Sequence, residues 1–589
     1  MKPIQKKAKE LFTRIKVTIA VVIVCIAFAL FVNLKFTEVK KEKQVELIFS
    51  PFLKIPKCSA NGGFYKSPFF VELNPGTEGT SIFFTLDGSE PDLSSAQYHE
   101  PVLIQDRTSE DNDLSAIPTS PRWMPPIGNV RKGIVLRAIE VDSTNKKSDE
   151  LVCTFLVSSA ENKAITLPVV CITVNEADLF GYKNGIYVPG KSYWDKDNYI
   201  SKNIRLDIPW WEYPSNYLLR GEDAERPAHI EFFEPGGKPG FELNAGVRIN
   251  GKSTRGYAQK SLRLCFRKKY GISFLQYDLF SEGKSDNFNS FLLRNAGNDW
   301  DKAMLRDALM GSLMKNSNVD IQRYRPTIVF INAEYWGIHE IRERLDENYL
   351  ANKYQLSADS ISILELYGKL VVGKKQEEKN FAELLNFVKM NDLSVKMNYE
   401  YVNSLMDMDS FIDFLIANMY SNNSDWPNNN VKYWRYTGFN TNDSIHKGAG
   451  KWHWMLYDMD WGMGYNDRSA PECDLLEKAS KVGSVGILFG GLLHNMEFRE
   501  KFLDRCRVLL NSTFDSAAVT GTIQNIALRM APEMEEHINR WRVIGSMKKW
   551  ESEVELVNNY ARKRPELFMK QLNSFFGLSG IRQITLKRQ

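Results

Sequence analysis

The segment NSDWPNNN, at residues 423–430, is the most informative stretch of this chain. It follows a run of apolar residues at helical spacing between residues 411 and 419, and it places Asn430 five residues after Asp425. A carboxylate and an amide on one loop suit phosphoryl transfer, because the carboxylate reaches the acceptor hydroxyl and the amide oxygen reaches a metal ion that bridges the phosphates. The spacing alone is common by chance, so its meaning depends on the sequence around it.

A second acidic segment, LYDMDWG at residues 456–462, follows two short strand patterns joined by a polar loop. Asp458 and Asp460 therefore lie just past a strand, where kinases hold their second metal ligand. Two carboxylates this close repel each other, and a divalent cation would stabilise both charges. The simpler interpretation is that both are turn residues before a glycine. It is less favoured once the first segment is considered.

A phosphotransferase also needs a cation on the nucleotide phosphates. Two alternating strand patterns, residues 246–250 and 260–266, flank the glycine-bounded loop GKSTRG at residues 251–256. Lys260 begins the second strand directly after this loop, as a nucleotide-binding lysine would. The alternatives are three other cations of the loop and strand: Lys252, Arg255 and Arg263. Any one of these side chains is equally compatible with an ordinary surface position.

Six segments, in this order, resemble the spore coat protein H (CotH) family. They are GVRINGKSTR (246–255) with QKS (259–261), LRN (293–295) with ND (298–299), LRD (305–307), FINAEYWG (330–337), NSDWPNNN (423–430) and LYDMD (456–460). The resemblance covers about residues 165–565. It implies an α+β domain with two lobes, similar to atypical protein kinases, and an activity that uses ATP with Mg²⁺ or Mn²⁺.

The resemblance also implies roles for the acidic and amide residues. It makes Asp425 the catalytic aspartate and Asn430 a metal ligand. One member of the Asp458/Asp460 pair is the other metal ligand. Asp458 is favoured because it ends the strand directly, while Asp460 keeps the D-x-G form and stays open as a ligand.

For the nucleotide, the resemblance implies that Lys260 contacts the phosphates. Two further cations of the same region are candidates: Arg255 and Lys252. The expected kinase C-helix, at residues 301–314, contains no glutamate, only Asp301 and Asp307, and so departs from the usual Lys–Glu pair. Glu340 and Glu343, on the second strand of a hairpin predicted over residues 327–341, are possible substitutes or contacts of the hinge between the lobes.

The N-terminus predicts a membrane anchor. Six basic residues within the first 16 precede an uncharged apolar run at residues 17–32. A stretch of about 17–25 apolar residues spans a bilayer, and the basic flank stays in the cytoplasm. We therefore expect a single-pass anchor within residues 1–35, a spacer at 36–50, and the bulk of the chain outside the cell membrane. A cleavable signal peptide is the alternative, because AFA at residues 27–29 resembles a cleavage site.

Residues 51–158 predict an all-β, immunoglobulin-like sandwich, because short β-rich runs alternate with turn residues. The segment TLDGSEP at residues 85–91 resembles the chitobiase/β-hexosaminidase C-terminal-type domain, an accessory module, and implies no hexosaminidase catalysis. A polar, proline-rich stretch at residues 105–127 predicts a long loop. Cys58 and Cys153 bracket the domain, either as a disulfide in an oxidising compartment or as two free thiols.

The rest of this multidomain chain is expected to form the kinase-like N-lobe at residues 165–375 and the C-lobe at 376–589. A net charge of only +4 offers no basic face for nucleic acid, so the expected partners are an exported or surface protein substrate and the membrane. A catalytically inactive kinase-fold scaffold, in a coat or in adhesion, is the alternative function. A glycoside-acting enzyme is less favoured, because its two carboxyls must lie on opposite sides of a sugar.

Overall fold

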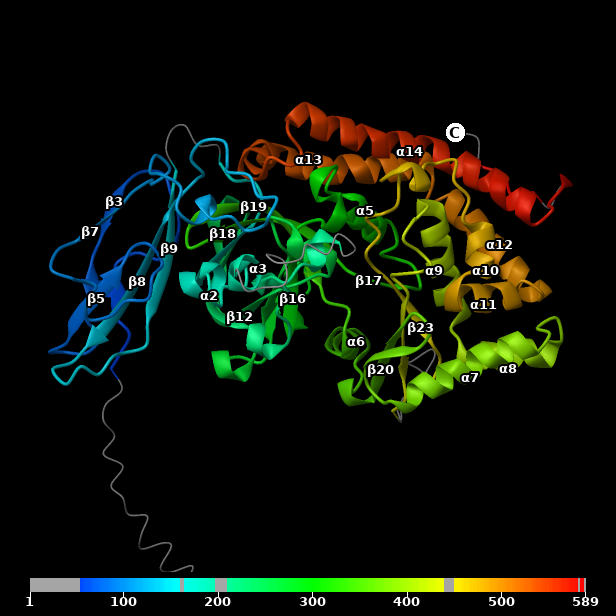
Figure 1. The fold of residues 1–589 in the computed structure, drawn as a ribbon, viewed down its shortest axis with the longest axis horizontal. Coiled ribbons are helices and arrows are strands. Elements are labelled where there is room, and N and C mark those ends of the chain that lie inside the picture. The colour runs from blue at the N-terminus through cyan, green and yellow to red at the C-terminus, as the bar shows by residue number, and fades with distance from the viewer. Residues whose placement is uncertain (1–52, 159–163, 196–208, 439–449, 581–582, 587–589) are drawn as a thin grey trace, which may run out of the picture.

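The computed structural model describes residues 53–158, 164–195, 209–438, 450–580 and 583–586. It shows a β-rich N-terminal domain followed by a larger α/β domain (Figure 1). The predicted anchor and spacer lie outside the described residues. Within the described part of the chain, no helix is both long enough and apolar enough to cross a membrane.

The N-terminal domain is built from two layers of strands around an apolar core. Its main sheet has the order β2-β9-β8-β5-β6, formed by Gly63–Tyr65, Leu151–Val157, Ile134–Val141, Ser81–Thr85 and Ala96–Gln97. Two small sheets complete it, β3 (Phe69–Val71) with β7 (Val102–Ile104) and β1 (Lys57–Cys58) with β4 (Leu73–Asn74). The core contains buried side chains of both layers, among them Val71, Ile104, Leu136 and Phe155. Cys58 packs against this core, and its thiol hydrogen-bonds that of Cys153.

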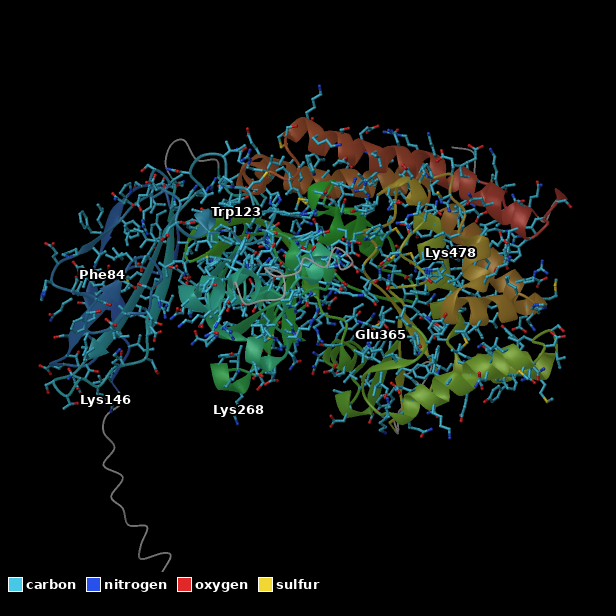
Figure 2. The ribbon with its side chains drawn as sticks, in the orientation of Figure 1. Phe84, Trp123, Lys146, Lys268, Glu365 and Lys478 are labelled. Atoms are coloured by element: carbon cyan, nitrogen blue, oxygen red, sulfur yellow. The ribbon has the colours of Figure 1, made fainter. Side chains whose placement is uncertain are left out.

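The connection between β7 and β8, residues 105–133, leaves the β domain and lies on the larger domain; we call it the crossing loop. Leu114 from this loop is buried in the apolar core of the barrel described next. Figure 2 shows Trp123 over the barrel, and its ring packs against the same core. The predicted loop is therefore an interdomain contact rather than a solvent-exposed excursion.

A closed barrel begins the larger domain. Its strands follow the order β10-β11-β12-β13-β16-β19-β18, formed by Val169–Val174, Arg226–Glu234, Lys238–Ile249, Leu262–Cys265, Ser290–Arg294, Glu334–Glu343 and Tyr324–Ile331. Side chains alternate between the two faces of each strand. Val247, Leu264 and Leu293 fill the interior, so their neighbours Arg263 and Arg294 face outward. This outer face is the one that carries charge.

The predicted hairpin is confirmed as β18 and β19. Its turn residues, Asn332 and Ala333, both have positive φ, at 45° and 59°, as a two-residue hairpin turn requires. The predicted helix at residues 301–314 is shorter than expected. A 3₁₀ turn at Gly297–Asp301 precedes α5, which spans Arg306–Leu313.

The C-terminal half contains a second sheet, of order β17-β23-β22-β20-β21, covered by helices (Figure 1). Its strands are Asp320–Ile321, His453–Leu456, Lys432–Tyr436, Ile361–Glu365 and Lys369–Val372. The helices are α6 (Glu347–Tyr354), α7 (Gln376–Met390), α8 (Lys396–Leu405), α9 (Met408–Ser421), α10 (Leu476–Lys481), α11 (Gly483–Leu492), α12 (Met496–Leu510), α13 (Ser516–Trp541) and α14 (Met547–Phe575). Because β20 and β21 pair with this sheet, the second half begins before the predicted boundary at residue 375.

The helices fix the two halves to each other. Every residue of α9 except Asp409 is buried, which makes it the central helix of the second half. The long helix α13 extends to the barrel, where the backbone N–H of Ile338 donates to His537 Nδ1 at 3.0 Å. In Figure 2, Glu365 on β20 and Lys478 on α10 mark the second half, to the right of the barrel.

Candidate active site

The loop after α9 holds Asp425 in a defined orientation. Asn429 Nδ2 donates a hydrogen bond to Asp425 Oδ1 at 2.8 Å, and Asn430 Nδ2 donates to Oδ2 at 3.1 Å. Asn430 Nδ2 also donates to the carbonyl oxygen of Asp458 at 3.2 Å. Asn430 Oδ1 accepts no hydrogen bond from the described residues, so it is open as a ligand. The structure thus brings together Asp425, Asn430 and Asp458.

Asp458 and Asp460 follow β23 and differ in exposure. Asp458 has 37% of its side chain exposed, whereas that of Asp460 is fully buried. Arg294 Nη2 donates to Asp458 Oδ1 and to Asp460 Oδ2, both at 2.9 Å. Asp460 Oδ2 also accepts from the backbone N–H of Asn298 at 2.7 Å. Burial and the nearby Asp458 carboxylate raise the pKa of Asp460 to about 8. Asp458 is therefore the accessible member of the pair.

Arg294, at the end of β16, lies at the centre of a charge network. Its Nε is 3.8 Å from Asp307 Oδ2 and 4.0 Å from Glu340 Oε2. Asp307, in the first turn of α5, also accepts from Arg342 Nη2 and from the backbone N–H of Met459. A strand cation paired with an acid on the next helix is the arrangement of the Lys–Glu pair in kinases. Here an arginine and an aspartate take those two places.

Arg294 and Asp307 are site residues that the sequence pattern did not predict, although both belong to segments that resemble the CotH family. The signal was the order of elements. A strand ends in Arg294, and the next helix carries Asp307 in its first turn. The expectation of a lysine and a glutamate hid this pair.

Lys260 and Arg255 do not face this cluster. Lys260 is fully buried, and its Nζ donates to the carbonyl oxygens of Arg255 and Tyr257 at 2.8 and 2.7 Å. Burial holds the pKa of Lys260 well below its ordinary value. Arg255 directs its guanidinium to backbone carbonyls of four residues, Gly251, Tyr217, Leu219 and Ile249. Both cations are occupied inside the loop, so the geometry argues against our expectation that they contact the nucleotide.

The two remaining nucleotide candidates occupy different surroundings. Lys252 is exposed on the loop between β12 and β13. Glu343, at the end of β19, accepts from the backbone N–H of Arg323 at 3.1 Å and from Arg323 Nη2 at 2.7 Å. It lines a cavity of about 460 Å³ together with Asp286 and Asn348. Lys252 stays a candidate, whereas the Glu343 carboxylate is already paired.

The larger domain matches a known protein family. The family model described as "CotH kinase protein" matches residues 247–568, more than half of the chain. This chain belongs to the CotH family. A second family model, described as "Fn3 associated", matches residues 71–155 and confirms the β domain ahead of the CotH domain. A search of curated proteins finds no match for this chain.

The CotH domain offers oxygen ligands that fit a divalent cation. Within the described residues, no group of three or more His, Cys, Asp or Glu side chains is arranged to hold a metal ion. Mg²⁺ commonly binds through one or two carboxylates and completes its shell with water and phosphate oxygens. Asp458 and the open Asn430 Oδ1 match that smaller set. Burial, together with the Asp307 and Asp425 carboxylates, raises the pKa of Asp458 although Arg294 opposes the shift.

Two further cations of the CotH domain lie near Arg344, which follows β19. Arg263 Nε, on β13, is buried and has no hydrogen-bond partner among the described residues. Lys432, on β22, lies over the Tyr457 ring with Nζ 4.6 Å from its centre. Burial, with the nearby Arg344, lowers the pKa of both Arg263 and Lys432. This concentration of positive charge between the barrel and the second sheet would favour a polyphosphate.

Proposed function

We propose that the CotH domain is a protein kinase that transfers the γ-phosphate of ATP, with Mg²⁺ or Mn²⁺, to a hydroxyl of a protein substrate or of its own chain. The main support is the convergence of Asp425, Asn430 and Asp458 opposite Arg294. These residues come from three separate segments of the chain. Together they supply the acid, the amide and the cation that phosphoryl transfer needs.

Each residue has a distinct role in this proposal. Asp425, oriented by the amides of its loop, accepts a hydrogen bond from the acceptor hydroxyl and takes its proton as the oxygen attacks phosphorus. Asp458 and Asn430 Oδ1 hold the metal ion, which supplies positive charge to the phosphates when bound. Arg294 contacts the phosphate oxygens, and Asp307 keeps its guanidinium in position.

We also propose that the kinase acts outside the cell membrane, held by a single N-terminal span. The basic flank and the apolar run at residues 17–32 support this topology. The substrate would then be an exported or surface protein, and the net charge of +4 gives no support for a nucleic-acid partner. A catalytically inactive scaffold is the competing function, and the next experiment separates the two.

The test compares Asp425→Asn with Asp458→Asn in the full-length protein. Transfer of labelled phosphate is measured to the chain itself and to casein as a probe acceptor, alongside the melting shift caused by Mg²⁺ and ATP. Asp425→Asn should lower transfer about 10²–10⁴-fold and keep the melting shift. Asp458→Asn should lose the shift, because the metal ion loses its accessible carboxylate. The exposed Asp392, replaced by Asn, is the matched control.

Three results would change the assignment. If both variants fold and keep full transfer, the kinase proposal is wrong. If the natural protein shows neither transfer nor a melting shift, the scaffold function replaces it. If Asp460→Asn rather than Asp458→Asn loses the shift, the kinase proposal stands and the choice of metal ligand is wrong.

A further inference from the structure

The crossing loop of the β domain contacts the segment that connects β12 to β13. Thr119 Oγ1 donates to the carbonyl oxygen of Ala258 at 2.9 Å, and Ser120 Oγ donates to that of Gly256 at 2.7 Å. Both hydroxyl residues are buried, with at most 3% of either exposed. In protein kinases a glycine-rich loop covers the phosphates. The β domain therefore contacts the segment of the CotH domain that includes the glycine-bounded loop at residues 251–256.

The contacted segment leads directly to the acidic cluster. Tyr257 lies between the two hydroxyl contacts, and its OH donates to Asn298 Oδ1 at 3.0 Å. The backbone N–H of Asn298 donates to Asp460 Oδ2, which shares Arg294 with Asp458. A continuous set of hydrogen bonds thus runs from the crossing loop to the residue we assign to the metal ion.

Aromatic packing reinforces the same connection. Tyr257 stacks on Trp300 with ring centres 5.5 Å apart, and on its other side it stacks on Trp210 at 6.2 Å. The Arg122 guanidinium of the crossing loop lies 4.3 Å from the Trp210 ring centre. A side chain at Gly256 would come within 2.9 Å of Trp210. The segment is therefore packed closely between the crossing loop and the barrel.

The crossing loop is itself fixed at both ends. Near its start, the backbone N–H groups of Asp113 and Ser115 donate to the two carboxylate oxygens of Glu334, in the β18–β19 hairpin, at 3.0 and 2.7 Å. Near its end, the backbone N–H of Ile127 donates to the carbonyl oxygen of Asn539 at 2.9 Å. Because the loop is fixed on both sides of Thr119 and Ser120, it holds their hydroxyls in position to donate to the carbonyls of residues 256 and 258.

We propose that Thr119 and Ser120 are positioning residues of the CotH active site, acting through residues 256–258 to set the affinity for ATP and metal. The proposal rests on the kinase function above. It assigns the β domain to the catalytic unit, in place of the separable accessory module that the sequence suggested. Neither hydroxyl touches the reacting atoms. Their loss would leave two buried carbonyls without donors and loosen the segment that carries Tyr257.

The test is the double variant Thr119→Val/Ser120→Ala in the full-length protein. Hydrogen exchange of residues 251–258 should become faster without any nucleotide. The KM for ATP should rise about tenfold, since each hydrogen bond is worth a severalfold change, while kcat stays near its natural value. Asn129→Ala is the control, because among the described residues its side chain bonds only Ser109, in the same loop, at 3.1 Å, and it should change neither quantity.

Two additional variants keep the outcome decisive. The exchanged pair Thr119→Ser/Ser120→Thr keeps both hydroxyls and should restore slow exchange and the natural KM. Ser120→Ala alone serves if the double variant does not fold. Exchange and KM equal to those of the Asn129→Ala control would overturn the proposal, and so would faster exchange with an unchanged KM. If the natural protein does not bind ATP, the kinase function fails. Unchanged hydrogen exchange in the double variant would then also refute the positioning role. Faster exchange would confirm only that Thr119 and Ser120 hold residues 251–258 in place.

Discussion

Replacing Arg294 by glutamine should destabilise the folded CotH domain strongly. Its guanidinium lies 2.9 Å from both Asp458 Oδ1 and Asp460 Oδ2, 3.8 Å from Asp307 and 4.0 Å from Glu340. Only 13% of the arginine side chain is exposed. The substitution therefore leaves four neighbouring carboxylates with one cation fewer in a largely buried place.

The size of the effect follows from the remaining partners. Removing one member of a buried ion pair usually costs about 3–5 kcal/mol. Arg342 still contacts Asp307 and Glu340, and a pKa of about 8 keeps Asp460 largely protonated at neutral pH. Both factors reduce the loss, so we expect about 3 kcal/mol, or a fall in Tm of about 3–4 °C for a domain of about 400 residues.

The assay is thermal unfolding at pH 7, with and without Mg²⁺ and in the absence of nucleotide. Arg263→Gln is the matched control, because Arg263 is a half-buried arginine on the neighbouring strand and makes no ion pair with the described residues. Mg²⁺ should raise the Tm of Arg294→Gln more than that of the natural protein, since the ion replaces part of the lost charge. A fall in Tm no larger than that of the control would refute the reasoning.

Three further predictions concern other parts of the molecule. Lys260→Met should speed hydrogen exchange of residues 251–258 without nucleotide, because Lys260 donates to two carbonyls there. Unchanged exchange together with weaker ATP binding would instead support the expectation that Lys260 binds phosphate. Oxidised glutathione should join Cys58 to Cys153, whose thiols hydrogen-bond each other. Closing a loop of about 100 residues stabilises the folded protein by up to about 4–5 kcal/mol. Thiol alkylation with mass spectrometry checks for the disulfide, and melting with and without reductant measures its effect on stability. Two alkylated thiols would contradict the prediction. Burial lowers the pKa of His339 to about 4 and that of His537 to about 3, so the unfolded state binds more protons below pH 6.5 and stability should fall from pH 6.5 towards pH 4. Urea midpoints should follow that fall, less steeply in His537→Gln, and an equal slope would exclude these histidines.

The sequence was sufficient where neighbouring residues determine the geometry. Asp425 and Asn430 share one loop, and the two strands that follow return the chain to Asp458, so proximity follows from the order of elements. The hairpin of β18 and β19 is local in the same way. The chemical roles of the three site residues stay predictions, because no local pattern reports a bound phosphate.

The sequence was not sufficient where distant segments decide the surroundings of a side chain. Lys260 follows a glycine-bounded loop, as a nucleotide lysine would, yet its ammonium is used by carbonyls of that same loop. The pairing of β20 with β22 joins segments about 70 residues apart on either side of residue 375, and no local pattern predicts it. The crossing loop is polar and proline-rich, which describes an exposed loop equally well. Only its docking buries Thr119 and Ser120.

The exchange of the usual Lys–Glu pair for Arg294 and Asp307 has a geometric basis. A guanidinium extends farther and presents several donors in a plane, while aspartate is one methylene shorter than glutamate, so the longer cation reaches the shorter acid. Arg294 contacts Asp458 and Asp460 together through one nitrogen, Nη2. In this structure Arg294 therefore occupies the carboxylate that we assign to the metal ion. A metal ion on Asp458 would displace that bond, and Nη2, still bonded to Asp460 Oδ2, would gain a free donor position for a phosphate oxygen. Binding of the metal ion to Asp458 removes one partner of Arg294, and a phosphate oxygen of the nucleotide takes the place of that partner. Metal and nucleotide binding should therefore be strongly cooperative.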